Sequence, residues 1–319
     1  MPTLAGLFKI EYIYQPKYLL RRIINSLTGY VGHVAALNIA DFYLPWGLTI
    51  QANPEEEHGE ILRRLGVIDL SVTESIWRLL KPDSTFLDVG ANIGYMSSIA
   101  IARLESFSQS NGKVIAYEPH PSIYHDFLQP NVERWRSQIE YTQISLHQIA
   151  LSDRSGLAEL AIPVEFERNQ GLAQVIPISE DSGDFSFKYS PVKSFDRLSI
   201  QCQRLDDCFA DTDTVNLMKI DVEGHELAVF KGASKCLEQQ RIHHIIFEAH
   251  DGYPSSVTNF LESHGYTFFG VQRHILGPKL VSPDSNNAAV KWLPTNYIAT
   301  CKQEETISQF SKGGWQIFQ

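Results

Sequence analysis

The sequence predicts an α/β protein built on a mostly parallel sheet with helices on both faces. From residue 84 onward, short apolar runs alternate with segments of helical periodicity, a pattern typical of parallel strands joined by crossover helices. The length of 319 residues suits one catalytic-sized domain with an appended region. We therefore expect a helical cap region over residues 1–80 and a main domain over residues 81–319.

The strands of the main domain are expected where apolar runs end in turn residues. They fall at residues 85–90, 113–119, 144–153, 215–224, 243–250, 266–272 and 296–301. Helices are expected between them at residues 95–104, 122–135, 225–240 and 254–265, with Pro130 interrupting the second of these. Right-handed crossovers should connect the parallel strands.

The N-terminal region shows helical patterns at residues 18–27, 55–66 and 72–82. The first pattern carries an apolar stripe with Arg21 and Arg22 on its polar side. This fits a helix packed on the main domain better than one lying on an anionic membrane, since two arginines are few for that role. We expect the region to shape a ligand pocket or a dimer contact, so a homo-oligomer stays open.

Residues 154–205 break the alternation of strands and helices and are too long for a plain connector. They contain a short alternating run at 157–162 and a polar segment at 179–191. We interpret them as an inserted hairpin with a loop near the ligand site. Within the insertion, residues 166–174 fit either a lid over the ligand or an ordinary turn.

Composition excludes several classes of partner. The net charge of −10 argues against nucleic acid, which requires a basic face. The four cysteines are scattered and form no C-x-x-C pair, which fits unpaired thiols in a reducing compartment. No apolar stretch approaches the roughly 20 residues of a membrane span, and no basic leader with an apolar core is evident. We expect a cytoplasmic protein with a small-molecule ligand.

A glycine turn after the first strand of the main domain marks the expected ligand site. Asp88 ends that strand, and the turn from Gly90 to Gly94 leads into a helix. Glycine allows a positive φ and a close approach of backbone. Ligands of open parallel sheets bind at the carboxyl ends of the strands, where the strand order reverses. The turn is therefore the expected place for a nucleotide-like cofactor.

The residues around this turn favour S-adenosylmethionine over a dinucleotide. Ala91 and Asn92 interrupt the G-x-G-x-x-G pattern that binds a pyrophosphate. Glu118 ends the second strand and can accept both hydroxyls of a ribose, which the two cofactors share. The carboxylate of Asp88 suits an ammonium and a sulfonium group and would repel a pyrophosphate. In "ALSD" (150–153), the Ser152 or Asp153 side chain can meet an adenine edge.

The motifs together resemble the FkbM-type family of S-adenosylmethionine-dependent methyltransferases. The similar stretches are "FLDVGANIGYMS", "AYEPHPS", "ALSD", "RLDDCF", "LMKIDVEGHELAVFKGA", "IIFEAH" and "NYIAT", in that order. The resemblance implies a class I methyltransferase sheet of seven mixed strands, with "NYIATC" inserted antiparallel. It also implies O-methylation of sugars, polyketides or other small natural products. The residues expected at the cofactor are Asp88, Gly90, Ala91, Asn92, Gly94, Tyr95, Glu118, Pro119, Leu151, Ser152 and Asp221.

Transfer to an alcohol releases a proton, which favours a base or a metal near the acceptor. Asp221 and Glu223 end the fourth long strand, and Glu248 and His250 end the fifth. All four should point towards the transferred methyl group. His250 titrates near neutrality and suits a base. Alternatively, Asp221 and Glu248 could hold a magnesium ion.

Three other functions stay open at this point. An N- or C-methyltransferase would share the same cofactor half of the fold. An NAD-dependent dehydrogenase would use the same strand ends, although the middle glycine of its usual motif is missing. A non-catalytic module could keep the cofactor as a structural ligand. The expected acceptor of an O-methyltransferase is a sugar, a glycolipid or a secondary metabolite.

Overall fold

The computed structural model describes residues 9–28, 39–167, 169–176, 194–249, 251–283 and 296–319. Its centre is an eight-stranded sheet with the order β13-β12-β14-β11-β10-β3-β4-β5. The strands are β3 (Thr85–Val89), β4 (Lys113–Tyr117), β5 (Gln143–His147), β10 (Val215–Ile220), β11 (Ile242–Glu248), β12 (Thr267–Gln272), β13 (Lys279–Val281) and β14 (Asn296–Thr300).

Strand pairing confirms the predicted mixed sheet and adds one strand to it. The five strands β11, β10, β3, β4 and β5 pair in parallel. Strand β14 pairs antiparallel with β11 on one side and β12 on the other, as expected for residues 296–301. The eighth strand, β13, was not predicted, because three partly exposed residues at a sheet edge give no recognisable pattern.

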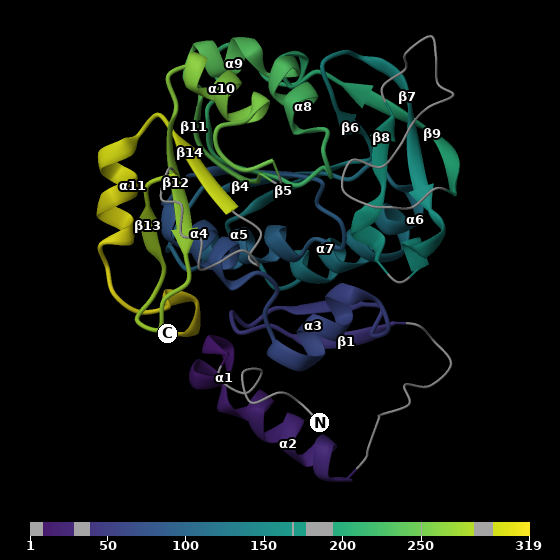
Figure 1. Cartoon of the computed structure of the whole chain (residues 1–319), viewed down its shortest axis with the longest axis vertical. Coiled ribbons are helices and arrows are strands. Elements are labelled where there is room, and N and C mark those ends of the chain that lie inside the picture. Colours follow the sequence, from purple (N-terminus) through teal and green to yellow (C-terminus); the bar gives the residue numbers. More distant parts are fainter. Residues whose placement is uncertain (1–8, 29–38, 168, 177–193, 250, 284–295) are drawn as a thin grey trace.

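Helices cover both faces of this sheet (Figure 1). One face carries α4 (Leu70–Leu79), α5 (Tyr95–Glu105) and α7 (Gln129–Arg136), and the other carries α8 (Glu226–Gly232), α9 (Ser234–Glu238) and α10 (Ser256–Ser263). The apolar side chains alternate accordingly: Phe86 and Leu217 belong to the first core, Leu87 and Met218 to the second. Helix α11 (Gln303–Phe310) packs beside α4 through Phe310.

Pro130 does not end the helical path predicted at 122–135. A short α6 (Pro121–Ile123) continues through a π-helical turn over Tyr124–Leu128 into α7. Proline has no N–H to donate, and its ring crowds the carbonyl four residues earlier, at Asp126. The wider turn falls at that residue and lets the path continue.

A second sheet contains most of the described insertion. Its order is β6-β9-β7-β8, with β6 at Ala150–Leu151, β7 at Gly156–Pro163, β8 at Gln174–Ile176 and β9 at Phe195–Gln203. The single strand predicted over 144–153 is therefore wrong: β5 ends at His147, and β6 pairs with β9 instead. The polar segment 179–191 lies outside the described residues.

The N-terminal region contains a β-hairpin besides its helices. Helices α1 (Ile10–Tyr14), α2 (Pro16–Thr28) and α3 (Glu57–Leu65) accompany an antiparallel pair of β1 (Ala40–Tyr43) and β2 (Thr49–Ala52). The hairpin was not predicted from the sequence. Side chains of α7 hold it: the Trp135 indole donates to the Thr49 carbonyl at 2.7 Å, and Asn131 bonds both backbone groups of Gln51.

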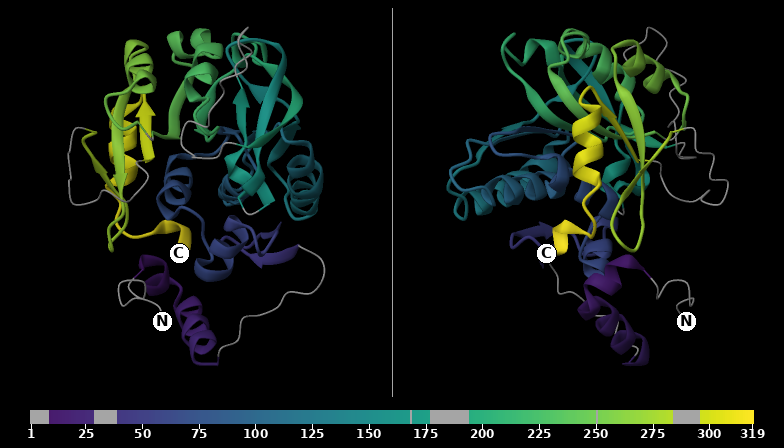
Figure 2. Two further views of the ribbon diagram at one scale, coloured as in Figure 1. Left: turned by 45° about the vertical axis from the view of Figure 1, so that its right-hand side comes forward. Right: turned by 90° about the vertical axis from the view of Figure 1, so that its left-hand side faces the viewer.

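The two ends of the described chain meet at the side opposite α8–α10. Figure 2 shows the C-terminal residues close to α1. Tyr14 stacks on Phe318 with ring centroids 5.6 Å apart, and its hydroxyl donates to the Ile275 carbonyl. Trp315 is fully buried and packs this tail onto the rest of the chain. Among the described helices, none has the length and apolar character needed to cross a bilayer.

Candidate functional site

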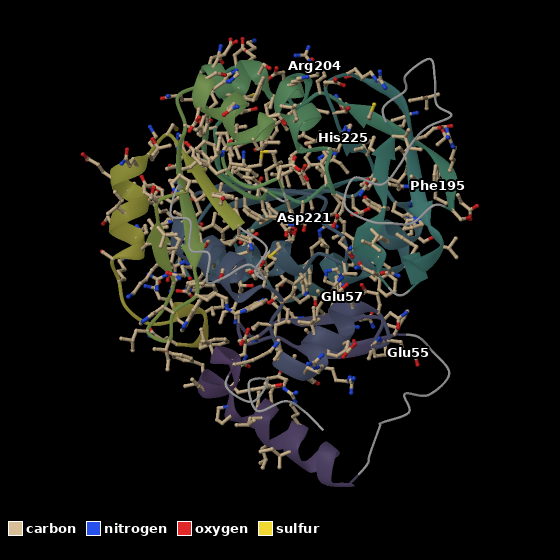
Figure 3. The ribbon with its side chains drawn as sticks, viewed as in Figure 1. Glu55, Glu57, Phe195, Arg204, Asp221 and His225 are labelled. Atoms are coloured by element: carbon tan, nitrogen blue, oxygen red, sulfur yellow. The ribbon has the colours of Figure 1, made fainter. Side chains whose placement is uncertain are left out.

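A cavity of about 470 Å³ opens at the carboxyl ends of β3, β4, β10 and β11. It lies where the strand order reverses between β3 and β10, as expected for an open parallel sheet. The second sheet and helix α3 complete its walls. Figure 3 labels three of its lining residues, which come from two segments: Asp221 and His225 from the loop after β10, and Glu57 from α3. The residues predicted for the site that line this cavity are Gly90, Ala91, Asn92, Tyr95, Glu118, Pro119, Leu151, Asp221, Glu223 and Glu248.

The turn after β3 is held in shape by its protein neighbours. Gly90 has φ +77°, and a Cβ there would lie 1.9 Å from the Asp221 carbonyl oxygen. The Gly90 and Ala91 N–H groups both donate to the Tyr117 carbonyl, at 3.0 and 2.9 Å. Gly94, at φ +88°, faces the apolar side chains of the π turn and α7. The group that requires glycine at position 90 is thus the backbone at the end of β10.

Asp88 lies beneath the turn and does not line the cavity. Its side chain is fully buried, and Oδ2 accepts from the Ser97 hydroxyl at 2.7 Å. Its Oδ1 has no hydrogen-bond partner in the described structure. Burial raises the pKa of Asp88, and the Lys219 ammonium opposes this shift. A buried carboxylate with one unused oxygen fits a cationic neighbour above the turn.

Glu118 connects the turn to the second strand. Its Oε2 accepts the Asn92 N–H at 2.8 Å, and its Oε1 accepts the His120 N–H at 2.9 Å. The Asn92 backbone has φ +50°, so Glu118 stabilises an uncommon conformation there. Burial raises the pKa of Glu118 to about 7. Each oxygen keeps capacity for a further donor, which fits the two hydroxyls of a ribose.

A buried pair of side chains lies beside the cavity, where β6 ends and α8 begins. The Ser152 hydroxyl lies 2.9 Å from Nε2 of His225, which precedes α8 as expected. Burial lowers the pKa of His225 to about 4, so the imidazole is neutral at pH 7. Ser152 does not line the cavity, but His225 and Leu151 do. Sequence reasoning gave His225 only a helix-start role and missed its place in the wall.

Three carboxyl groups gather at the ends of β10 and β11. Burial, followed by the charges of Asp221 and Glu248, raises the pKa of Glu223 to about 8. Burial and the Asp221 charge raise the pKa of Glu248 to about 7. Lys219 is buried, and its Nζ lies 2.8 Å from Asp221 Oδ2. His250, the fourth predicted residue, lies outside the described residues.

The carboxyl groups do not form a recognisable metal site. Within the described ranges, no group of three or more His, Cys, Asp or Glu side chains is arranged to hold an ion. The magnesium alternative at Asp221 and Glu248 therefore has no geometric support. The two groups can accept hydrogen bonds or a proton when ionised, and each can donate when protonated.

Several lining residues come from segments that sequence reasoning did not connect to the site. Helix α3 contributes Glu57 and His58, and the loop before β8 contributes Asn169, Gln170 and Gly171. The only sequence signal for any of them was the expectation that residues 166–174 could cover the ligand. Further lining residues are Asp69, Arg273 and Asn296.

Comparison with known proteins gives a consistent result. A family model described as "Methyltransferase FkbM domain" matches residues 88–268. The hexuronic acid methyltransferase AglP of Haloferax volcanii is 27% identical over 208 residues, covering 60% of this chain and 69% of that protein. The AMB antimetabolite synthetase AmbE of Pseudomonas aeruginosa is 26% identical over 214 residues, which cover 59% of this chain but 10% of that protein.

Two solved structures also align with this chain, at low scores. A precorrin-6y C5,15-methyltransferase from Geobacter metallireducens aligns with a TM-score of 0.36 and 16% identity, covering 72% of this chain and 86% of that one. An S-adenosylmethionine-dependent O-methyltransferase from Thermotoga maritima aligns with a TM-score of 0.35 and 15% identity, covering 79% and 73% of the two chains.

Proposed function

The chain belongs to the FkbM methyltransferase family, and from this premise we propose that it methylates a hydroxyl oxygen of a sugar or related small natural product. Family membership makes it an S-adenosylmethionine-dependent methyltransferase. When bound, that cofactor supplies a methyl group on a sulfonium, which is a good leaving group. The protein's main task is then to hold the acceptor oxygen in line with the methyl group.

The cofactor end of the cavity is formed by the ends of β3 and β4. We assign the ribose hydroxyls to Glu118, because it lines the cavity and backbone N–H groups fix both of its oxygens in place. The backbone of the turn at Gly90–Asn92 would line the amino acid part, with the Asp88 carboxylate behind it. Leu151 and the neutral His225 would bound the adenine.

The acceptor end is formed by Asp221, Glu223 and Glu248. Their carboxyl groups lie beside the cofactor turn, and raised pKa values keep Glu223 and Glu248 partly protonated near neutrality. Such groups can both accept and donate hydrogen bonds to sugar hydroxyls. Lys219 limits the repulsion among them. His250 remains a candidate for the same end.

The flanking segments would shape the acceptor. Helix α3 lines the cavity through Glu57 and His58, which supports the proposal that residues 1–80 act as a cap on a methyltransferase domain over residues 81–319. The contact of Gln170 and Gly171 with the same cavity supports a lid role for the insertion at 154–205.

The observation that carries this proposal is that one cavity joins the Gly90 turn and Glu118 to the carboxyl groups of Asp221, Glu223 and Glu248. The similarity to a hexuronic acid methyltransferase favours a sugar as acceptor. The acidic lining favours one alternative, an N-methyltransferase acting on an amine, because carboxylates attract an ammonium group.

The test is methyl transfer from S-adenosylmethionine carrying a ¹³C-labelled methyl group. The probes are methyl β-D-glucoside, methyl β-D-glucuronide and D-glucosamine, and the product signal separates a methyl ether, a methyl ester and an N-methyl group. We expect the ether. An N-methyl product alone would replace this proposal by the amine alternative. Parallel reactions with EDTA and with added Mg²⁺ test the metal alternative.

A further inference from the structure

Glu56 and His58 form a hydrogen-bonded pair at the start of α3. Glu56 caps the helix: its Oε2 accepts the His58 N–H at 2.9 Å, while its Oε1 lies 3.0 Å from Nδ1 of the same residue. The Glu56 side chain is 1% exposed, so it holds the imidazole from a fixed position. With Nδ1 donating to Glu56, Nε2 carries the lone pair. Nε2 has no hydrogen-bond partner in the part of the chain that the structure describes.

The His58 ring reaches the same small volume as the Glu223 carboxyl group. A Cβ built on Gly171 would lie 3.9 Å from Glu223 Oε1 and 4.0 Å from His58 Cε1. The absence of a side chain at Gly171 keeps this volume open. Both residues also line the cavity that contains the cofactor turn.

The insertion is fastened to α3 beside this pair. Asn169 Nδ2 donates to Glu57 Oε2 at 2.5 Å, and the Gln170 N–H donates to Glu56 Oε1 at 3.4 Å. Three segments far apart in the sequence, at α3, before β8 and after β10, therefore meet around one point. This arrangement places an imidazole opposite the acidic end of the cavity.

We propose that His58, held by Glu56, is the base that takes the proton of the acceptor hydroxyl. This inference rests on the proposed O-methyl transfer. As the acceptor oxygen bonds to the methyl carbon, the carbon–sulfur bond breaks and its electron pair stays on sulfur. The acceptor O–H proton moves to Nε2 of His58, and the imidazolium is paired with the Glu56 carboxylate. The proton then leaves to solvent.

The charges around His58 suit this task. Burial alone would lower the pKa of His58, but the hydrogen bond and charge of Glu56, with the charges of Asp221 and Glu57, raise it overall. A base must be neutral to act, so the rate should rise with pH through the pKa of His58. Glu223 faces the same volume, and burial raises its pKa to about 8, so it is a second group whose titration can affect the rate. Variants are therefore needed to separate the two groups.

The first experiment measures methyl transfer to methyl β-D-glucoside and methyl β-D-glucuronide by three variants. These are His58→Gln, Glu56→Gln and a control, His125→Gln, whose exposed ring lies on the π turn beside Gln129 and outside the cavity lining. We expect His58→Gln to lower kcat by about 100-fold or more and to remove the acid limb of the pH profile. Glu56→Gln should move that limb to lower pH, and the control should change neither.

The second experiment needs no acceptor. The ¹³C-labelled histidine Cε1–H signal of His58, identified by its loss in His58→Gln, is titrated with S-adenosylhomocysteine bound. We expect a pKa above the ordinary 6.5, lowered by Glu56→Gln and unchanged by His125→Gln. A His58 that does not titrate between about pH 5 and 9, or that ignores Glu56→Gln, would overturn the inference.

The outcomes separate this inference from the proposed function. Calorimetric affinity for S-adenosylhomocysteine should stay within about twofold in His58→Gln, which excludes misfolding. Transfer that is intact in this variant, with its acid limb retained, would overturn the role of His58 alone. Failure of the folded wild-type protein to bind S-adenosylhomocysteine would instead overturn the proposed function.

Discussion

Adding a single methyl group at Gly90, as in Gly90→Ala, should strongly disturb the site. In the structure, the Gly90 backbone has φ +77°, and an added Cβ would lie 1.9 Å from the Asp221 carbonyl oxygen. Real Cβ atoms do not approach backbone this closely, so Gly90→Ala must displace the end of β10. That end carries Asp221, and the carboxyl group of Glu223 follows it.

The expected loss of unfolding free energy in Gly90→Ala has two parts. An L-residue at this φ costs about 1–2 kcal/mol. Overpacking against backbone that must shift adds about 1–3 kcal/mol. The chain offers a control for the first part alone: Gly47, in the turn between β1 and β2, has φ +90° and no atom within 4 Å of an added Cβ. Gly47→Ala should therefore lose about 1–2 kcal/mol of unfolding free energy, and Gly90→Ala about 2–5 kcal/mol.

The assay is urea unfolding of the two variants and the wild-type protein, followed by calorimetric titration with S-adenosylhomocysteine. Gly90→Ala should lose both stability and affinity, because the displaced Asp221 and the turn share the cavity wall. Gly47→Ala should keep its affinity. Equal stability and equal affinity in the two variants would refute the argument that the Asp221 carbonyl fixes glycine at position 90.

Two further changes test the electrostatics and the packing of the site. Burial raises the pKa of Glu223 above its value in the unfolded chain, so the folded state binds the proton more tightly. The contribution of Glu223 to stability therefore falls as pH rises from about 4.5 to about 8. In urea unfolding, Glu223→Gln should gain stability relative to wild type between pH 5 and pH 9, and the exposed control Glu133→Gln should not. Asn131 is fully buried and forms hydrogen bonds to the Gln51 backbone at 2.7 and 3.0 Å and to the Ile93 carbonyl at 2.9 Å. Asn131→Ala should lower the free energy of unfolding by about 2–3 kcal/mol, because the Gln51 N–H loses its partner. A loss under about 0.5 kcal/mol would contradict this prediction.

Most strands of the central sheet could be predicted from the sequence, because they are local apolar runs of ordinary length. The class I methyltransferase fold that the family resemblance implied is confirmed, including the antiparallel strand at Asn296–Thr300. The additional edge strand β13 and the hairpin of β1 and β2 were missed. Each of these strands is three or four residues long, which is too short to give a clear alternating pattern.

The division of residues 144–153 between two sheets was missed for a different reason, a distant partner. Apolar residues recur through the range, but β5 has the alternating exposure of an edge strand and ends at His147. Its continuation at Ala150–Leu151 pairs with β9, about fifty residues later. This pairing depends on where β9 lies in the folded chain, and no local pattern within residues 144–153 predicts it.

Some residues of the candidate site could be predicted from the sequence, and others could not. Residues at the cofactor end follow from one turn and the strand ends beside it, so Gly90 and Glu118 could be named from the sequence. The reason for Gly90 could not, since its neighbour Asp221 is 131 positions away. Glu56 and His58 read locally as an ordinary helix start, and only the folded chain places them opposite Glu223.

The most direct test of the central claim is calorimetric titration with S-adenosylhomocysteine and, separately, NAD. The variants are Glu118→Ala and a control, Glu105→Ala, which also removes a carboxylate that accepts backbone N–H groups but lies outside the cavity. We predict that the wild-type protein binds S-adenosylhomocysteine and not NAD. Glu118→Ala should lose about 1.5–3 kcal/mol of binding free energy, at least tenfold in affinity, and Glu105→Ala should lose none. Binding of NAD by the folded protein, no binding of S-adenosylhomocysteine, or equal losses in the two variants would contradict the account.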